Sequence, residues 1–182
     1  MRIQVTAGFL LLAAFLIFAD NNDIFIWFAA SMMVHESAHL AVLYLLGGRV
    51  TACRLSLWGA SVTAGGLSYG GEIAAALAGP IASLCAAFAA SRAGLVMAAG
   101  LSLMAGAYNL LPARCLDGGR VVELALSWMG RPNAAYRVLR VTTPLSAAAV
   151  GVPLCAAFSR GVYNWTLLMS ALFLGLSAFW DL

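Results

Sequence analysis

Two histidines and a glutamate carry the clearest chemical signal in this chain. His35 and His39 are the two histidines among its 182 residues, and with Glu36 they form an HExxH motif. Side chains four residues apart lie on one face of a helix, so both imidazoles can bind one metal ion while Glu36 lies beside the water that the metal holds. This spacing predicts a zinc site with His35 and His39 as ligands and Glu36 as the catalytic acid–base group.

The HExxH motif lies within an apolar stretch, residues 24–46, where ionisable groups are costly and therefore indicate function. Across the whole chain 63% of the residues are hydrophobic and 9% are charged. An ordinary soluble domain has roughly 25% charged residues. The composition therefore predicts a multi-pass integral membrane protein.

Six apolar runs are long enough to cross a bilayer. The first is followed by Asp20-Asn21-Asn22-Asp23 rather than a small-residue cleavage site, so we interpret it as a membrane helix and not as a signal peptide. The prediction is an all-α polytopic fold in a single integral-membrane domain, residues 1–182. Its catalytic core is expected at about 24–130, with additional helices at 138–180. The six predicted transmembrane helices cover residues 3–19, 24–46, 72–90, 94–111, 138–158 and 162–180.

A short β-hairpin is predicted between the second and third membrane helices. Residues 47–71 are rich in Gly, Ser and Thr, and Val50 to Val62 has strand character around a turn at Gly59. Non-helical backbone at membrane depth needs shelter from protein or a water-filled cavity, so this membrane-associated hairpin is expected to line one. An edge strand of the hairpin could also pair with an extended segment of a protein ligand. That hypothesis fails if proline substitutions along the hairpin leave the protein's action on such a ligand unchanged.

The arginines predict the orientation in the membrane. All ten basic residues are arginine, and a cytoplasmic Arg2 places eight of them on its side, with Arg92 and Arg160 opposite. We therefore expect a cytoplasmic N-terminus and a site accessible from the cytoplasm. The net charge of +3 follows from this topology and requires no nucleic-acid partner.

A third zinc ligand is expected among the acidic residues outside the loops and the chain end. Elimination leaves Glu72, Asp117 and Glu123. Asp117 is favoured because Pro112 should end or bend the helix before it, and the glycines that follow let the backbone turn closely. Glu72 is expected to cap the third membrane helix or to face the interface, and Glu123 to pair with nearby arginines.

At these residues the chain resembles the site-2 protease family of intramembrane zinc metalloproteases, peptidase M50. That family pairs HExxH on one membrane helix with N-x-x-P…L-D-G on a later one, matched here by Asn109, Pro112, Leu116, Asp117 and Gly118. A third element, A-x-A-G-P, is matched at residues 76–80, and the resemblance covers about residues 31–122. The chain looks most like the compact bacterial branch that includes a sporulation sigma-factor-processing protease. Cys115 stands where that branch often has a second proline, which affects the local bend and not the ligand.

The resemblance implies a site and an activity. Asp117 would complete the ligand set of one Zn²⁺ per chain, and Asn109 would orient the substrate or stabilise the oxyanion. The implied enzyme is a zinc metalloendopeptidase that hydrolyses a peptide bond in or near a transmembrane segment of a membrane-tethered protein, as in regulated intramembrane proteolysis. The expected partners are that substrate, the lipid bilayer and a membrane regulatory protein.

Two other functions fit parts of the pattern. In a membrane metal or proton transporter, the same residues would form a transit site, but the internal repeats that would support this are absent from the sequence. An inactive protease relative acting as a binding protein would not need Glu36. The small residues of the third helix, Ala78, Gly79, Ala82 and Ser83, are expected to serve close helix packing.

Overall fold

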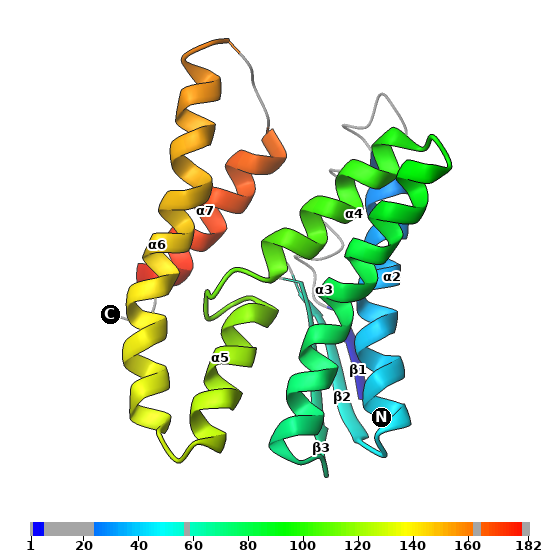
Figure 1. Cartoon of the computed structure of the whole chain (residues 1–182), viewed down its shortest axis with the longest axis vertical. Helices are drawn as coiled ribbons and strands as arrows, with labels where there is room; N and C mark the ends of the chain where they lie inside the picture. The colour runs from blue at the N-terminus through cyan, green and yellow to red at the C-terminus, as the bar shows by residue number, and fades with distance from the viewer. Residues whose placement is uncertain (1, 6–23, 57–58, 162–164, 180–182) are drawn as a thin grey trace. The chain divides into compact units, whose positions relative to one another are not determined.

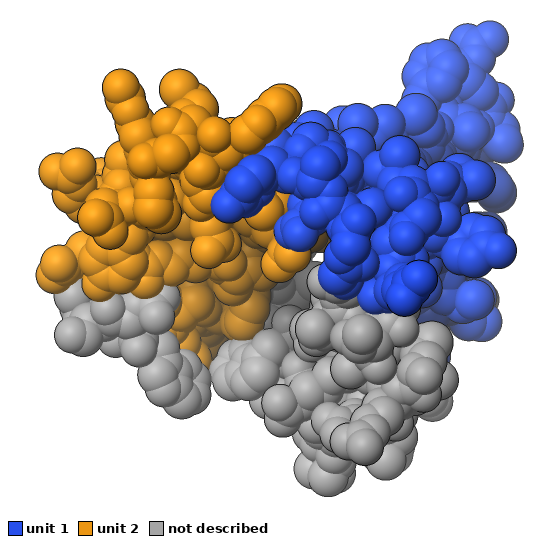
Figure 2. All heavy atoms as spheres, turned by 90° about the horizontal axis from the view of Figure 1, so that it is seen from below, with its two compact units in different colours: residues 1–108 blue, residues 109–182 orange. Residues whose placement is uncertain are grey.

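The computed structural model describes residues 2–5, 24–56, 59–161 and 165–179 (Figure 1). The chain divides into two compact units, residues 1–108 and 109–182, which Figure 2 colours blue and orange. The HExxH motif belongs to the first unit, whereas Asp117 belongs to the second.

The first unit is built on two long helices that pack against each other, α2 (Ile24–Leu45) and α3 (Tyr69–Arg92). Helix α2 is followed by Gly47, whose φ of 79° lets the chain turn away in the left-handed region. Helix α3 begins after Ser68, whose hydroxyl accepts the Gly71 N–H at 3.3 Å as an N-cap. A shorter helix, α4 (Val96–Asn109), follows.

A three-stranded sheet accompanies these helices, in the order β1-β2-β3. Strands β2 (Arg49–Ser56) and β3 (Gly59–Gly65) pair antiparallel where the sequence predicts a hairpin, with a register shift between Val50 and Ala52. Strand β1 (Arg2–Val5) pairs with β2 in parallel, so that Ile3 lies opposite Cys53.

Strand β1 corrects the prediction of a membrane helix over residues 3–19. Residues 3–5 of that range are extended and belong to the parallel ladder with β2. The reason is that an apolar run alone does not distinguish the start of a helix from a short strand, and here the pairing partner decides. The remainder of that predicted helix, residues 6–19, lies outside the described residues. The fold is therefore not purely helical.

The second unit contains three helices, α5 (Asp117–Trp128), α6 (Pro132–Phe158) and α7 (Trp165–Phe179). Helix α6 packs against both others. It begins at Pro132, ahead of the predicted residue 138, because proline at a first helical position has a suitable φ and loses no hydrogen bond. Its buried side chains include Leu139, Thr143 and Leu154.

Among the described helices, three are long and apolar enough to cross a membrane: α2, α3 and α6. Helices α4 and α7 have 14 and 15 residues, short of the roughly 20 that a bilayer core requires. The structure thus supports a membrane protein with three of the predicted spans, and the number six stays a prediction.

Candidate metal centre

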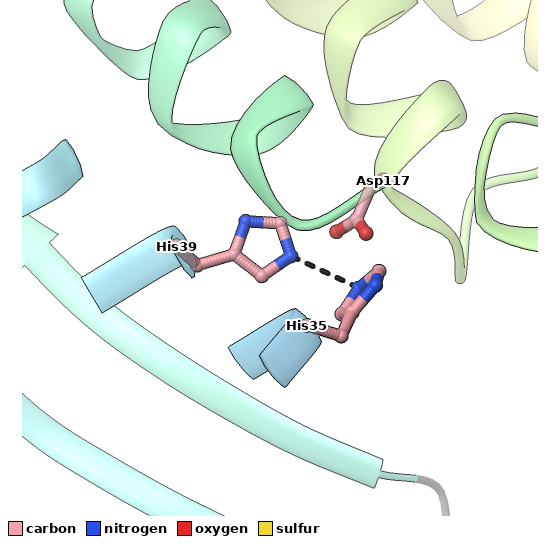
Figure 3. Close-up of side chains that lie close together, drawn as sticks. All are labelled: His35, His39 and Asp117. Carbon is pink, nitrogen blue, oxygen red and sulfur yellow. Dashed lines mark hydrogen bonds between the residues drawn. The ribbon is translucent and has the colours of Figure 1, made fainter. Parts of the chain in front are cut away.

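The two histidines of the HExxH motif lie together on α2 and face one another. Their Nε2 atoms are 3.1 Å apart, drawn as the dashed line in Figure 3, and the rings meet edge to face with centroids 4.8 Å apart. His35 is buried at 2% exposure, and His39 is half-buried. The helical spacing therefore brings the imidazoles together as the sequence predicts.

The second nitrogen of each ring, Nδ1, lies within hydrogen-bond distance of a residue of α3. The backbone carbonyl of Ala75 accepts a hydrogen bond from His39 Nδ1 at 2.7 Å. His35 Nδ1 lies 2.9 Å from the hydroxyl oxygen of Ser83, which is fully buried. Histidines that bind metal commonly use their second nitrogen in this way, and the bond fixes the orientation of the ring.

Gly79 lets α3 approach the His39 ring. A Cβ on Gly79 would lie 2.6 Å from Cε1 and 2.7 Å from Cδ2 of His39, well inside van der Waals contact. The next residue, Pro80, is also buried. Because a side chain at position 79 would displace the ring, Gly79 serves the histidine pair as well as helix packing. Gly79 thus serves close packing, as the sequence predicts, and Ser83, which was expected only to pack, also lies against His35 Nδ1.

The donor set fits a zinc ion. Tetrahedral zinc with Zn–N bonds of about 2.0–2.1 Å separates two nitrogen ligands by roughly 3.3 Å. The observed 3.1 Å between the two Nε2 atoms is close to that value. Because the carbonyl of Ala75 can only accept, the proton of a neutral His39 stays on Nδ1, and Nε2 offers a lone pair toward His35. Neutral imidazole nitrogens are ligands that suit zinc.

Two other α2 side chains lie near the histidines in sequence. Glu36 directly follows His35 and is half-buried. Ser31 precedes His35 by four residues, so the two share a face of α2, and it is 5% exposed. The hydroxyl of Ser31 has no hydrogen-bond partner in the described structure. Such an orphaned polar atom is uncommon in a folded interior and calls for a functional explanation.

In the second unit, Asp117 is the first residue of α5 and is half-buried. A carboxylate is favoured in a first helical turn by the helix dipole. Gly118 and Gly119 follow it, and both are buried. A Cβ on Gly118 would lie 2.6 Å from the carbonyl oxygen of Leu111, and one on Gly119 would overlap the carbonyl of Ala113. The two glycines therefore allow residues 110–116 to pack directly on the start of α5.

Helix α6 fixes the same segment from another side. The Thr142 hydroxyl donates to the carbonyl of Pro112 at 2.5 Å, and the Arg114 N–H donates to Thr143 Oγ1 at 3.2 Å. The Arg114 guanidinium lies 4.5 Å from the centre of the Tyr136 ring and donates to the Tyr136 carbonyl. The non-helical stretch expected after the fourth membrane helix is thus present and tethered to α6.

The remaining predicted residues are distributed over both units. Asn109 is the last residue of α4 and is half-buried, three residues before Pro112, as expected for a helix ending ahead of a proline. Glu72 lies in the first turn of α3, and Glu123 is exposed on α5. Within the described part of the chain, the structure brings together His35 and His39. The contacts of Ala75, Gly79 and Ser83 with the histidine rings were not predicted from the sequence. These three residues are four positions apart, so they lie on one face of a helix.

Comparison with known proteins gives one family match and a similar solved structure. Residues 64–150 match the model of Peptidase family M50, a region that contains Asp117 but not the HExxH motif. No curated protein sequence matches the chain. A solved structure of a Site-2 Protease from Methanocaldococcus jannaschii is similar, with a TM-score of 0.68 and 22% identity, covering 97% of this chain and 88% of that one. This likeness shows a shared fold. The family match, which covers just under half of the chain, and the shared fold both agree with a resemblance to peptidase family M50.

Proposed function

We propose that the protein is an intramembrane zinc metalloprotease that hydrolyses a peptide bond in or near a transmembrane segment of a membrane-tethered substrate. The observation that carries the proposal is the histidine pair. The Nε2 atoms of His35 and His39 lie 3.1 Å apart on an apolar helix of membrane-spanning length. The Nδ1 atom of each ring lies within hydrogen-bond distance of a residue of α3. The match of residues 64–150 to a peptidase family supports the reaction type.

The proposed ligand set is His35, His39 and Asp117 for one zinc ion per chain. Figure 3 draws these three side chains, the two imidazoles from α2 and the carboxylate from α5, and each offers one atom that can bind a metal ion. Two imidazoles and one carboxylate leave a fourth position for water, as in catalytic rather than structural zinc sites. Zinc in such a site activates a water molecule near neutral pH and polarises the scissile carbonyl.

The protein residues supply proton transfer and orientation. Glu36 is proposed to take the proton of the attacking water and to return it to the leaving amine. Asn109 is proposed to orient the substrate or to stabilise the oxyanion. The substrate would reach the site from the cytoplasmic side of a bacterial membrane, alone or with a membrane regulatory protein. A helical substrate must first unwind, because its peptide bonds are hydrogen-bonded within the helix.

The test is cleavage of a single-pass membrane substrate by purified protein in liposomes, with the zinc content measured in the same samples. The wild type is expected to bind about one zinc per chain and to cleave. Glu36→Gln should retain the zinc and lose cleavage by at least about a hundredfold, because general acid–base catalysis contributes roughly 10²–10⁴. Asp117→Asn should weaken zinc binding, whereas Glu36→Gln should leave zinc binding unchanged.

The same liposomes separate the rival functions. A metal transporter would move zinc across the bilayer without cleaving any substrate, and Glu36→Gln would then alter flux. An inactive binding protein would hold the substrate without cutting it, in wild type and variant alike. The protease proposal fails if wild type and Glu36→Gln cleave equally, or if neither contains zinc.

A further inference from the structure

Three positions of α3 meet the histidine pair at regular intervals. Ala75, Gly79 and Ser83 are four residues apart, so they lie along one face of α3, opposite His39 and His35. Ala75 acts through its backbone carbonyl and Gly79 through the absence of a side chain. Ser83 differs from them because it contributes a hydroxyl group, and that hydroxyl is fully buried against His35 Nδ1.

The partner of each Nδ1 decides which nitrogen of each ring carries the proton. For His39 the partner is a carbonyl, which can only accept, so the neutral ring has its proton on Nδ1. A hydroxyl can either donate or accept, so Ser83 allows both neutral forms of His35. The state of His35 therefore depends on the direction in which the Ser83 hydroxyl points.

These two directions correspond to two states of the site. When the hydroxyl donates to His35 Nδ1, the neutral ring carries its proton on Nε2, the nitrogen that lies 3.1 Å from His39 Nε2. When the hydroxyl accepts from Nδ1–H, the Nε2 lone pairs of both rings are available to a cation. The hydroxyl hydrogen can then turn to a carbonyl of the preceding helical turn, as helical serines commonly do.

We propose that Ser83 is a positioning residue for the metal centre. Its hydroxyl fixes the His35 ring and, by reversing its hydrogen bond, changes His35 from a donor to His39 into a metal ligand. This inference rests on the proposed zinc site, and it concerns α3 rather than the ligands themselves.

The test measures zinc binding and the histidine protonation state in a Glu36→Gln background, where the substrate cannot be cut. Zinc affinity is obtained by competition with a chelator, and the ¹⁵N shifts of the His35 ring report which nitrogen carries the proton. Ser83→Ala is expected to lower zinc affinity about 10- to 100-fold, the usual effect of losing such a partner. In the metal-free protein, the His35 ¹⁵N shifts should also move.

Two further variants separate hydrogen bonding from packing. Ser83→Thr keeps the hydroxyl and should retain zinc affinity within a few-fold of the parent. Ser102→Ala removes another buried serine hydroxyl, on α4 at 5% exposure, and should leave zinc binding unchanged. Absence of zinc from the Glu36→Gln parent would overturn the proposed function itself. Zinc held equally by parent and Ser83→Ala, with unchanged His35 shifts, would overturn only the role of Ser83. The same conclusion follows if folded Ser83→Thr loses as much affinity as Ser83→Ala.

Discussion

At the scale of single residues, the proposed metal centre depends on a glycine as much as on its proposed ligands. The His39 ring occupies the space that a side chain at position 79 would fill. Its Nδ1 is bonded to the Ala75 carbonyl at 2.7 Å, so the ring cannot move away without losing that hydrogen bond. Packing and hydrogen bonding therefore fix His39 from two directions.

Gly79→Ala is expected to reduce zinc affinity by about 10- to 100-fold, because the added methyl group displaces a ligand from the orientation that its outer hydrogen bond sets. Cleavage should fall with the zinc content. Gly100→Ala is the matched control: it changes a helical glycine of α4 with nothing within 4 Å of the new Cβ. Chelator competition on both purified variants measures the difference. Equal zinc affinity in the two would show that His39 does not need this space.

The sequence predicted His35 and His39 as a pair because their geometry is local to one helix. It did not predict the contacts of Ala75, Gly79 and Ser83, because these arise when α3 packs on α2, across 36 residues for His39 and Ala75 and 48 for His35 and Ser83. Small residues at helical spacing equally indicate simple helix packing. Only the position of the rings distinguishes the two interpretations.

At the scale of elements, the segment between α4 and α5 is held on both sides. Gly118 and Gly119 at the start of α5 have no side chains, so the backbone of the segment packs directly against them. The hydroxyl groups of Thr142 and Thr143 on α6 hydrogen-bond to Pro112 and Arg114. Asp117 follows immediately. The contacts of the segment with α5 and α6 therefore set the position of the Asp117 backbone, and with it the position of the carboxylate.

Thr143→Val is expected to destabilise the second unit by about 1–3 kcal/mol, because Arg114 N–H loses a buried acceptor while the side-chain shape is nearly kept. Since Asp117 lies three residues after Arg114, zinc affinity should fall as well. Ser159→Ala is a suitable control, because it removes a hydroxyl at the exposed end of α6 that bonds Ala156 O at 2.9 Å. Thermal unfolding in detergent and zinc titration report the two effects. Identical behaviour of both variants would contradict a role for Thr143 in placing the segment.

The elements themselves were predicted unevenly. The apolar runs of α2, α3 and α6 were located correctly because each is long and continuous in the sequence. Strand β1 was missed because its four residues form a strand only through pairing with β2, whose partner residues lie 50 positions later, as for Arg2 and Ala52. Long-range pairing of this kind leaves little trace in a short apolar run.

At the scale of the whole molecule, many large apolar side chains of the described residues are exposed, while several hydroxyl-bearing side chains are buried. Met33 on α2 and Phe88 on α3 are 73% and 71% exposed, whereas Ser83, Ser102 and Thr143 are at most 5% exposed. Soluble proteins rarely expose so many large apolar side chains along the same long helices. This distribution suits a chain surrounded by lipid, with its polar groups turned toward protein.

The arginine distribution predicts which loops face the cytoplasm. Arg92 and Arg131 are both exposed, at the end of α3 and just before α6. In a chain whose native cysteines are replaced by serine, Arg92→Cys should react with a membrane-impermeant maleimide in intact spheroplasts, and Arg131→Cys only after permeabilisation. Labelling of whole and opened cells measures this. The reverse pattern would invert the orientation and place the site's access on the outer side.

The close approach of α3 to His39 also provides a criterion for judging related sequences. A relative can keep HExxH and the later aspartate and still carry a larger residue where Gly79 stands. Such a chain would hold every ligand in its sequence yet present one of them in the wrong place. Surveys for pseudoproteases that check only the ligand positions would count it as active. A larger residue at position 79 would indicate that the proposed zinc site of such a chain is impaired.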